Sequence, residues 1–190
     1  MRRLAAILTL LAAPCAWADD QPATTPTRDV DIQYRLPTKP GAPEVGQRVR
    51  WEAATGRERI DPPTPGLHII VDTRLHRLAS VRDAEKVAME IDSAQMQPAQ
   101  GAPTAQYVRR GDGTVAGLAC TDWQAGTAET APLLCFTADG VLLRVSAEGR
   151  VVAEAVRVTY APADPADFTI PPDYRRVVRQ PDDTARKDKP

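Results

Sequence analysis

Cysteine, histidine and aromatic residues are scarce in this chain of 190 residues. It contains three cysteines and two histidines, and aromatic residues make up 5% of the sequence. His68 and His76 have no further ligand at close spacing, so the usual zinc patterns are missing and we expect no metal site. A G-x-S-x-G motif and a Ser-His-Asp arrangement are also missing. We therefore expect no catalytic residues, no cofactor and no enzymatic activity.

An excess of positive charge is missing as well. The 24 basic residues are balanced by 25 acidic ones, which gives a formal net charge of −1 at pH 7. Proteins that bind nucleic acid usually present a clustered basic surface. The composition therefore predicts no nucleic-acid partner.

The first 18 residues have the pattern of a secretory signal peptide. Two arginines precede the apolar run Leu4–Ala13, and residues 16–18 (Ala-Trp-Ala) supply a cleavage site. The run is too short for a membrane-spanning helix, so we expect no transmembrane span after signal removal. Lipidation of Cys15 would require a small residue before it, where Pro14 stands. The pattern favours a cleaved periplasmic protein over a lipoprotein.

The rest of the chain alternates apolar and polar residues over short runs, which is typical of half-buried β-strands. Tight-turn pairs such as Asp139-Gly140 and Glu148-Gly149 separate these runs, so the sequence predicts an antiparallel sheet. Asp164 followed by Pro165 predicts one short helix, with an N-cap and a proline in the first turn. The alternating runs are Val30–Leu36, Val49–Ala53, Leu67–Val71, Leu75–Arg82 and Val87–Ile91.

Composition divides the chain into four parts. We expect a signal peptide at residues 1–18, a flexible N-terminal segment at 19–28, a single β-rich domain at 29–177 and a disordered charged tail at 178–190. Within the domain, Asp92–Gln106 is a low-complexity loop that is long for a compact fold. This loop is either a lid over the domain or a disordered surface loop.

Cys120 and Cys135 are the two cysteines that remain after signal removal. An even count in an oxidising compartment favours a disulfide between them. A register with Cys120 directly opposite Cys135 also places the small residue Ala119 opposite the bulky Phe136. A reactive thiol would need a nearby base and a metal site would need more ligands, and the sequence shows neither.

Two hairpin registers follow from the turns. The turn at residues 139–140 predicts Phe136 opposite Leu143 and Leu134 opposite Val145. Both faces of this hairpin are then apolar, so a helix, another part of a curved sheet or a ligand must cover the second face.

The hairpin around residues 53–56 predicts Arg50 opposite Arg59. This like-charge contact requires either an anion or separated side chains. We expect His68, which alternates with apolar neighbours, at the surface.

The segment Asp139–Val177 begins with the Asp-Gly turn, continues with long strands and ends with Asp164, Phe168 and the prolines at 171 and 172. It resembles the closing segment of the periplasmic lipoprotein-carrier (LolA-like) superfamily, and Gln47–Asp72 loosely resembles that superfamily's strand, proline loop and strand. The resemblance implies a mainly β fold. It also implies a curved antiparallel sheet, an unclosed β-barrel with one or two short helices. In the carriers of this superfamily the apolar concave face holds acyl chains, which we expect here as well. The long lid helices and the ligand-gating arginine of the carriers have no match here.

The sequence thus predicts a periplasmic, non-enzymatic protein that binds a lipid or an acyl chain on the concave face of a curved sheet. The alternative is an envelope module that contacts another protein through exposed sheet edges or through the Asp92–Gln106 loop. The candidate residues for the apolar face are Trp51, Ile69, Val71, Met89, Phe136 and Leu143.

Overall fold

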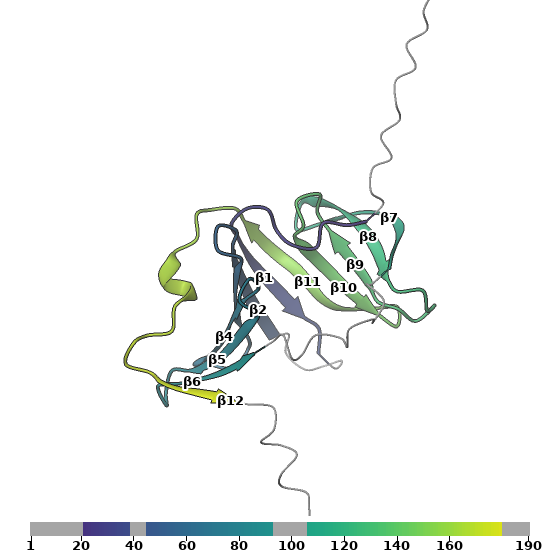
Figure 1. Cartoon of the computed structure of the whole chain (residues 1–190). Coiled ribbons are helices and arrows are strands. Elements are labelled where there is room, and N and C mark those ends of the chain that lie inside the picture. Colours follow the sequence, from purple (N-terminus) through teal and green to yellow (C-terminus); the bar gives the residue numbers. More distant parts are fainter. Residues whose placement is uncertain (1–20, 39–44, 93–105, 180–190) are drawn as a thin grey trace, which may run out of the picture.

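The computed structural model describes residues 21–38, 45–92 and 106–179. These residues form one twelve-stranded sheet, strongly curved and not closed into a barrel (Figure 1). The expected mainly β class and curved sheet are therefore confirmed. The strands are β1 (Val30–Leu36), β2 (Val45–Glu52), β3 (Arg57–Asp61), β4 (Leu67–Asp72), β5 (Arg77–Arg82), β6 (Val87–Asp92), β7 (Tyr107–Val115), β8 (Leu118–Ala125), β9 (Leu133–Phe136), β10 (Leu142–Ala147), β11 (Arg150–Thr159) and β12 (Arg175–Arg179).

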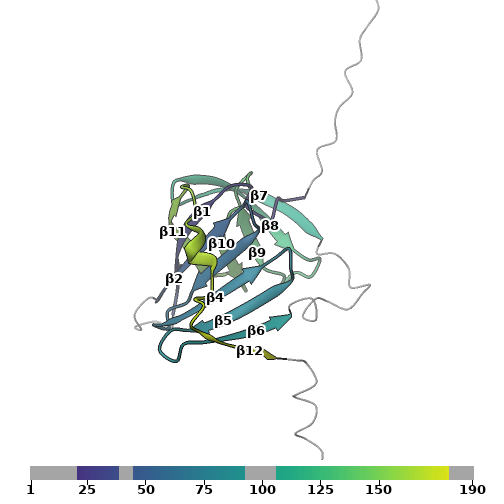
Figure 2. The same ribbon diagram turned by 60° about the vertical axis from the view of Figure 1, so that its left-hand side comes forward.

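Two antiparallel meanders join in the middle of the sheet, where β1 pairs with β11. The strand order is β12-β6-β5-β4-β3-β2-β1-β11-β10-β9-β8-β7. The short 3₁₀ helix η2 (Pro165–Phe168) begins as the sequence predicts, because the Asp164 carboxylate accepts a hydrogen bond from the Ala166 amide. The chain then crosses the sheet to β12 (Figure 2).

Strand β12 departs from the expected meander. It pairs in parallel with β6, which is possible because residues 160–174 form a long crossover connection. Val178 and Arg179 belong to this strand, so it extends two residues into the segment that the sequence predicts as a disordered tail. The signal peptide and most of the Asp92–Gln106 loop lie outside the described residues.

Residues 21–28, expected to be flexible, contact the domain. The Thr27 amide donates to the Asp139 carbonyl oxygen, 3.0 Å away. The Arg28 guanidinium pairs with the Asp139 carboxylate at 2.8 Å and lies 3.6 Å from the centre of the Tyr160 ring. The N-terminal segment is thereby fixed beside the β9–β10 turn.

Charged residues occupy the face of the central sheet opposite the cavity described below. Arg50 and Arg59 are directly opposite each other on β2 and β3, as the sequence predicts. Asp61 supplies the anion they require, at 2.6 Å from Arg50 and 2.9 Å from Arg59, and Asp167 of η2 also pairs with Arg50. The Arg50–Asp167 pair holds η2 against β2, and a hydrogen bond from the Arg59 guanidinium to the Asp167 carbonyl oxygen holds it against β3.

The same face of β4–β6 is apolar and covered by the C-terminal segment. Ile70, Ala79, Val81 and Ala88 are buried there, and Ile170 and Tyr174 pack against them. His68 is 5% exposed on this face, opposite Val81 on β5, so the expectation of a surface histidine is wrong. Strand alternation could not reveal a cover that comes from a segment a hundred residues later in the chain.

The Cys120–Cys135 disulfide is present, with a Cα–Cα distance of 5.5 Å. The expected register is wrong by two residues, because Asp122 rather than Cys120 is opposite Cys135. The Ala125 amide donates to the Pro132 carbonyl oxygen, so the strands extend further and the loop between them is tighter than expected. The bridge is a diagonal link within one face of the sheet.

The β9–β10 hairpin contains a bulge. Leu134 is opposite Val145 as expected, but Phe136 is opposite Leu142 instead of Leu143. The Val141 amide donates to the Thr137 hydroxyl, which widens the turn, and the bulge absorbs the extra residue. Leu143 is completely buried in the core cluster that contains Cys120 and Cys135.

Candidate ligand cavity

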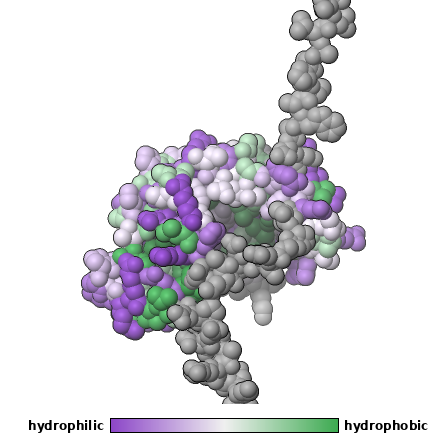
Figure 3. Space-filling view, in the orientation of Figure 1, coloured by the Kyte–Doolittle hydropathy of each residue, from purple (hydrophilic) through white to green (hydrophobic). Residues whose placement is uncertain are grey.

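A cavity of about 440 Å³ lies on one face of the sheet and receives side chains from β1, β2, β3, β9, β10 and β11. Six neighbouring strands can border one cavity only where the sheet curves around it, so this is the concave face. In the space-filling view the surface is hollowed here, with hydrophobic residues at the bottom (Figure 3). The lining residues are Thr24, Thr25, Pro26, Ile32, Tyr34, Leu36, Gln47, Val49, Trp51, Glu58, Ile60, Thr73, Phe136, Gly140, Leu142, Val145 and Ala153.

Strand alternation explains most of this wall. Ile32, Tyr34 and Leu36 are every second residue of β1, so they project to one face. Antiparallel pairing then places Val49 of β2 opposite Ile32 and Ile60 of β3 opposite Val49, and all three line the cavity. The wall is therefore apolar along the middle of the sheet.

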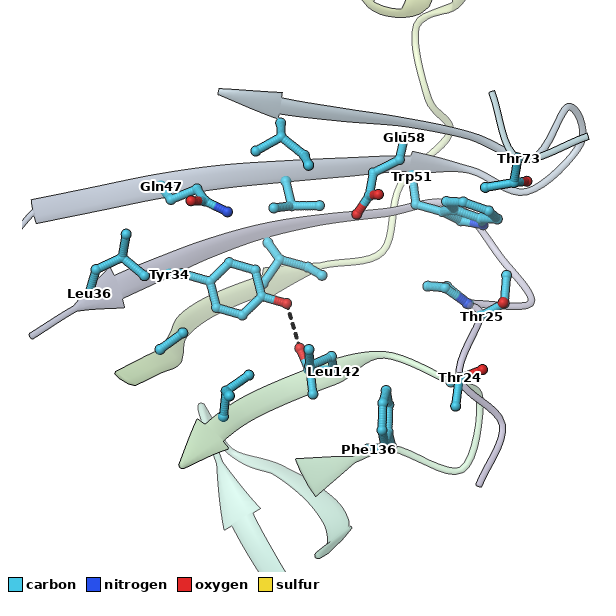
Figure 4. Close-up of a pocket in the computed structure, with 17 residues that line it drawn as sticks. Thr24, Thr25, Tyr34, Leu36, Gln47, Trp51, Glu58, Thr73, Phe136 and Leu142 are labelled. Carbon is cyan, nitrogen blue, oxygen red and sulfur yellow. Dashed lines mark hydrogen bonds between the residues drawn. The ribbon is translucent and has the colours of Figure 1, made fainter. Parts of the chain in front are cut away.

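Tyr34 fixes the two halves of the cavity relative to each other. Its hydroxyl donates to the Leu142 carbonyl oxygen at 2.5 Å and so links β1 to β10 across the concave face (Figure 4). Burial and the nearby charge of Glu58 raise the pKa of the Tyr34 hydroxyl above its usual range. Tyr34 is therefore a neutral hydrogen-bond donor at physiological pH.

Glu58 is the one acidic or basic side chain among the lining residues. Its carboxyl group points into the cavity between Tyr34 and Trp51 (Figure 4). It forms no hydrogen bond or ion pair with any residue that the structure describes, and burial raises the pKa of the carboxyl group. Glu58 is half-buried, and this is an unusual position for an unpaired carboxylate, since charges taken out of water are normally paired.

The N-terminal segment closes one end of the cavity. Thr24, Thr25 and Pro26 line it beside Gly140 of the β9–β10 turn. A Cβ atom at Gly140 would overlap the Thr25 carbonyl oxygen, and the φ angle of Gly140 is +88°. Only glycine allows this close approach, so the Asp-Gly turn shapes the cavity as well as the hairpin.

Of the six residues predicted for the apolar face, Trp51 and Phe136 line the cavity. Ile69 and Val71 lie outside it on the same face of the sheet, because they are opposite the cavity residues Ile60 and Glu58. Met89 lies further out, on β6 opposite Ser80, and is exposed.

Leu143 does not line the cavity, and Leu142 takes its place because of the bulge. Sequence reasoning also missed Tyr34 and Glu58. Glu58 could have been found, since the register that pairs Val49 with Ile60 also pairs Trp51 with Glu58. That register gives an acidic residue an inward position.

Other kinds of site were sought over the same part of the chain. In residues 21–38, 45–92 and 106–179, no three His, Cys, Asp or Glu side chains come together as a metal site would need. Within those ranges no helix has the length and apolar character to cross a membrane.

No protein-family profile matches this chain, and no curated protein sequence matches it. Several solved structures, however, do match it in fold. An uncharacterised conserved protein from Thermus thermophilus is 14% identical with a TM-score of 0.56, over 80% of this chain and 91% of that one. MucB is 11% identical with a TM-score of 0.50, over 81% of this chain and 61% of MucB.

The fold is LolA-like. A structure of PNGF-II also matches, at 10% identity and a TM-score of 0.52, over 81% of this chain and 31% of PNGF-II. At these identities the likeness concerns the fold alone, and the chain spans less than two thirds of MucB and of PNGF-II. The LolA-like fold agrees with the resemblance seen in Asp139–Val177 and leaves the activity to the cavity's own chemistry.

Proposed function

We propose that this protein is a periplasmic binding protein without catalytic activity, which holds a lipid or an acyl chain in the concave-face cavity. The observation that carries the proposal is the cavity itself. Its volume of about 440 Å³ falls within the roughly 300–1,000 Å³ of small-molecule sites, and its wall is mostly apolar. Burial of an alkyl chain against such a wall is favourable by about 0.8 kcal/mol per methylene group.

The periplasmic location has two supports. The N-terminal sequence has the features of a secretory signal peptide. The Cys120–Cys135 disulfide is a bond that persists in oxidising compartments and is rare in the cytosol.

Organic extraction of natively purified protein, followed by mass spectrometry, tests the proposal. We expect a stoichiometric amphiphile in the wild-type extract. Ala153→Phe places a large ring in the cavity and should abolish co-purification. Val156→Phe on the same strand is the matched control, because Val156 is 52% exposed and does not line the cavity. Absence of any bound lipid, together with no binding of apolar probes, would reject the proposal.

A protein-interaction module is the second candidate, and the open sheet edges favour it. Strands β7 and β12 each pair on one side only within the described sheet, and Val178 of β12 is 69% exposed. Such edges can accept a strand from a partner. Crosslinking from Val178 in the periplasm distinguishes the two candidate functions. A single protein adduct supports the protein-interaction module, and adducts with lipid alone reject it.

A further inference from the structure

The ionisable charge in the cavity wall is negative only. Glu58 is its acidic residue, and none of the other lining residues is lysine, arginine or histidine. The arginines of the neighbouring strands, such as Arg48 and Arg50 on β2, alternate to the opposite face and pair with Asp31 and Asp61 there. The protein thus provides no counter-ion for Glu58 among the described residues.

An unpaired carboxylate in an apolar cavity costs free energy, which a bound cation would offset. A ligand with a carboxylate or phosphate head would bring a second negative charge close to the first. A ligand with an uncharged head could at most donate a hydrogen bond, and would leave the carboxylate without a counter-ion. Among amphiphiles, those with an ammonium head are therefore electrostatically matched to this cavity.

Aromatic rings strengthen the same preference. Tyr34, Trp51 and Phe136 all line the cavity, and the carboxyl group of Glu58 lies between Tyr34 and Trp51 (Figure 4). The faces of aromatic rings attract cations, and aromatic residues around a bound ammonium group are a common recognition device. Three of the nine Tyr, Trp and Phe residues in the chain border this one space.

We propose that the cavity binds an amphiphile with a positively charged ammonium head, and that Glu58 is its counter-ion. The head lies beside Glu58 and the ring of Trp51, and the alkyl chain packs against Ile32, Val49 and Leu142. This inference rests on the proposed function and narrows its ligand to one chemical class. Within that class, a primary amine would add hydrogen bonds to the carboxylate, whereas a quaternary amine would depend on the rings.

The test compares four probes with the same alkyl chain: decylammonium, decyltrimethylammonium, decanol and decanoate. Each is titrated into the full-length mature protein below its micellar concentration, at pH 8, and followed by calorimetry. We expect the two ammonium probes to bind about tenfold more tightly than decanol. Decanoate should bind most weakly.

Two variants identify the source of the preference. Glu58→Gln should bring the affinities for decylammonium and decanol within about threefold of each other, and leave that for decanol unchanged. Glu85→Gln removes the same charge from an exposed turn residue and should behave as wild type. Since Glu58→Gln removes an unpaired charge, we expect it to fold, which a thermal melt will verify.

The outcomes separate this inference from the proposed function. If decanol binds but the ammonium probes bind no better, or if Glu58→Gln keeps the full preference, the ammonium inference is wrong and the apolar-binding proposal stands. If none of the four probes binds, both are wrong.

Discussion

Trp51 on β2 and Glu58 on β3 lie directly opposite each other, and both side chains line the concave-face cavity. The pair combines the largest apolar side chain of the wall with its one carboxyl group. The Trp51 indole nitrogen is also buried without a hydrogen-bond partner among the described residues. A buried, unpaired indole nitrogen and a half-buried, unpaired carboxyl group thus come from paired positions of two strands that border the cavity. Unpaired polar groups are a cost to folding, and costs of this kind concentrate at functional sites.

Glu58→Gln should stabilise the ligand-free protein at pH 7. Burial raises the pKa of Glu58, so its contribution to stability is fully present below the unfolded pKa of about 4.5 and is lost as pH rises through the folded pKa. We expect the melting temperature to rise by about 2–4 °C, which corresponds to roughly 1 kcal/mol in a domain of this size. The difference between wild type and variant should shrink at acidic pH. A lower melting temperature for Glu58→Gln at pH 7 would contradict this.

Gly140→Ala should destabilise the protein more than Gly149→Ala does. Both glycines have positive φ angles, so both substitutions carry a backbone cost of about 1 kcal/mol. Gly149 has no atom near its added Cβ, whereas at Gly140 the Thr25 carbonyl oxygen lies in the way. At Gly140 we expect the added methyl group to displace residues 24–26 from the turn. Faster hydrogen exchange of the backbone amides in this segment would measure the displacement. Equal melting temperatures for the two variants would show that the N-terminal segment is not held at the turn.

Removal of the disulfide should lower stability and spare the cavity. Replacement of both Cys120 and Cys135 by serine removes a crosslink between positions 15 residues apart. In the chain-entropy model this lowers the free energy of unfolding by about 3 kcal/mol. Neither cysteine lines the cavity, so probe binding measured well below the melting temperature should be unchanged. Labelling of two free thiols in the unreduced, denatured wild type would refute the bridge.

His68 should make the protein less stable as pH falls below about 6.5, its unperturbed pKa. Burial is the main reason that its pKa is lowered, and the charge of Arg59 acts in the same direction against the opposing effect of Asp83. The unfolded chain therefore takes up the proton first, and stability is lost between pH 6.5 and the folded pKa. A nuclear magnetic resonance titration of His68 measures this directly. A folded pKa at or above 6.5 would contradict it.

The local features of the fold could be predicted from sequence because short-range rules determine them. Alternation identified β1 and β2, the turn at residues 53–56 set the register of Arg50 and Arg59, and Asp164 with Pro165 located η2. An even number of cysteines in a chain expected in an oxidising compartment was enough to predict the Cys120–Cys135 disulfide.

The sequence-based predictions were wrong where strand register or burial depends on long-range packing or on a single extra residue in a strand. The bulge in β10 moved Leu143 out of the cavity and Leu142 into it, and a longer β8–β9 ladder moved Cys120 by two positions. The face on which His68 lies is covered by the C-terminal segment, whose Ile170 and Tyr174 pack on β4–β6 about a hundred residues later in the chain. Local sequence patterns carry no information about any of these three events.

Calorimetric titration of decanol into wild type, Ala153→Phe and Val156→Phe is the most direct test of apolar binding in the cavity. We predict one decanol molecule per wild-type chain, loss of binding in Ala153→Phe and unchanged binding in Val156→Phe. Failure of decanol to bind the wild type, or equal binding to all three proteins, would contradict the cavity as the ligand site.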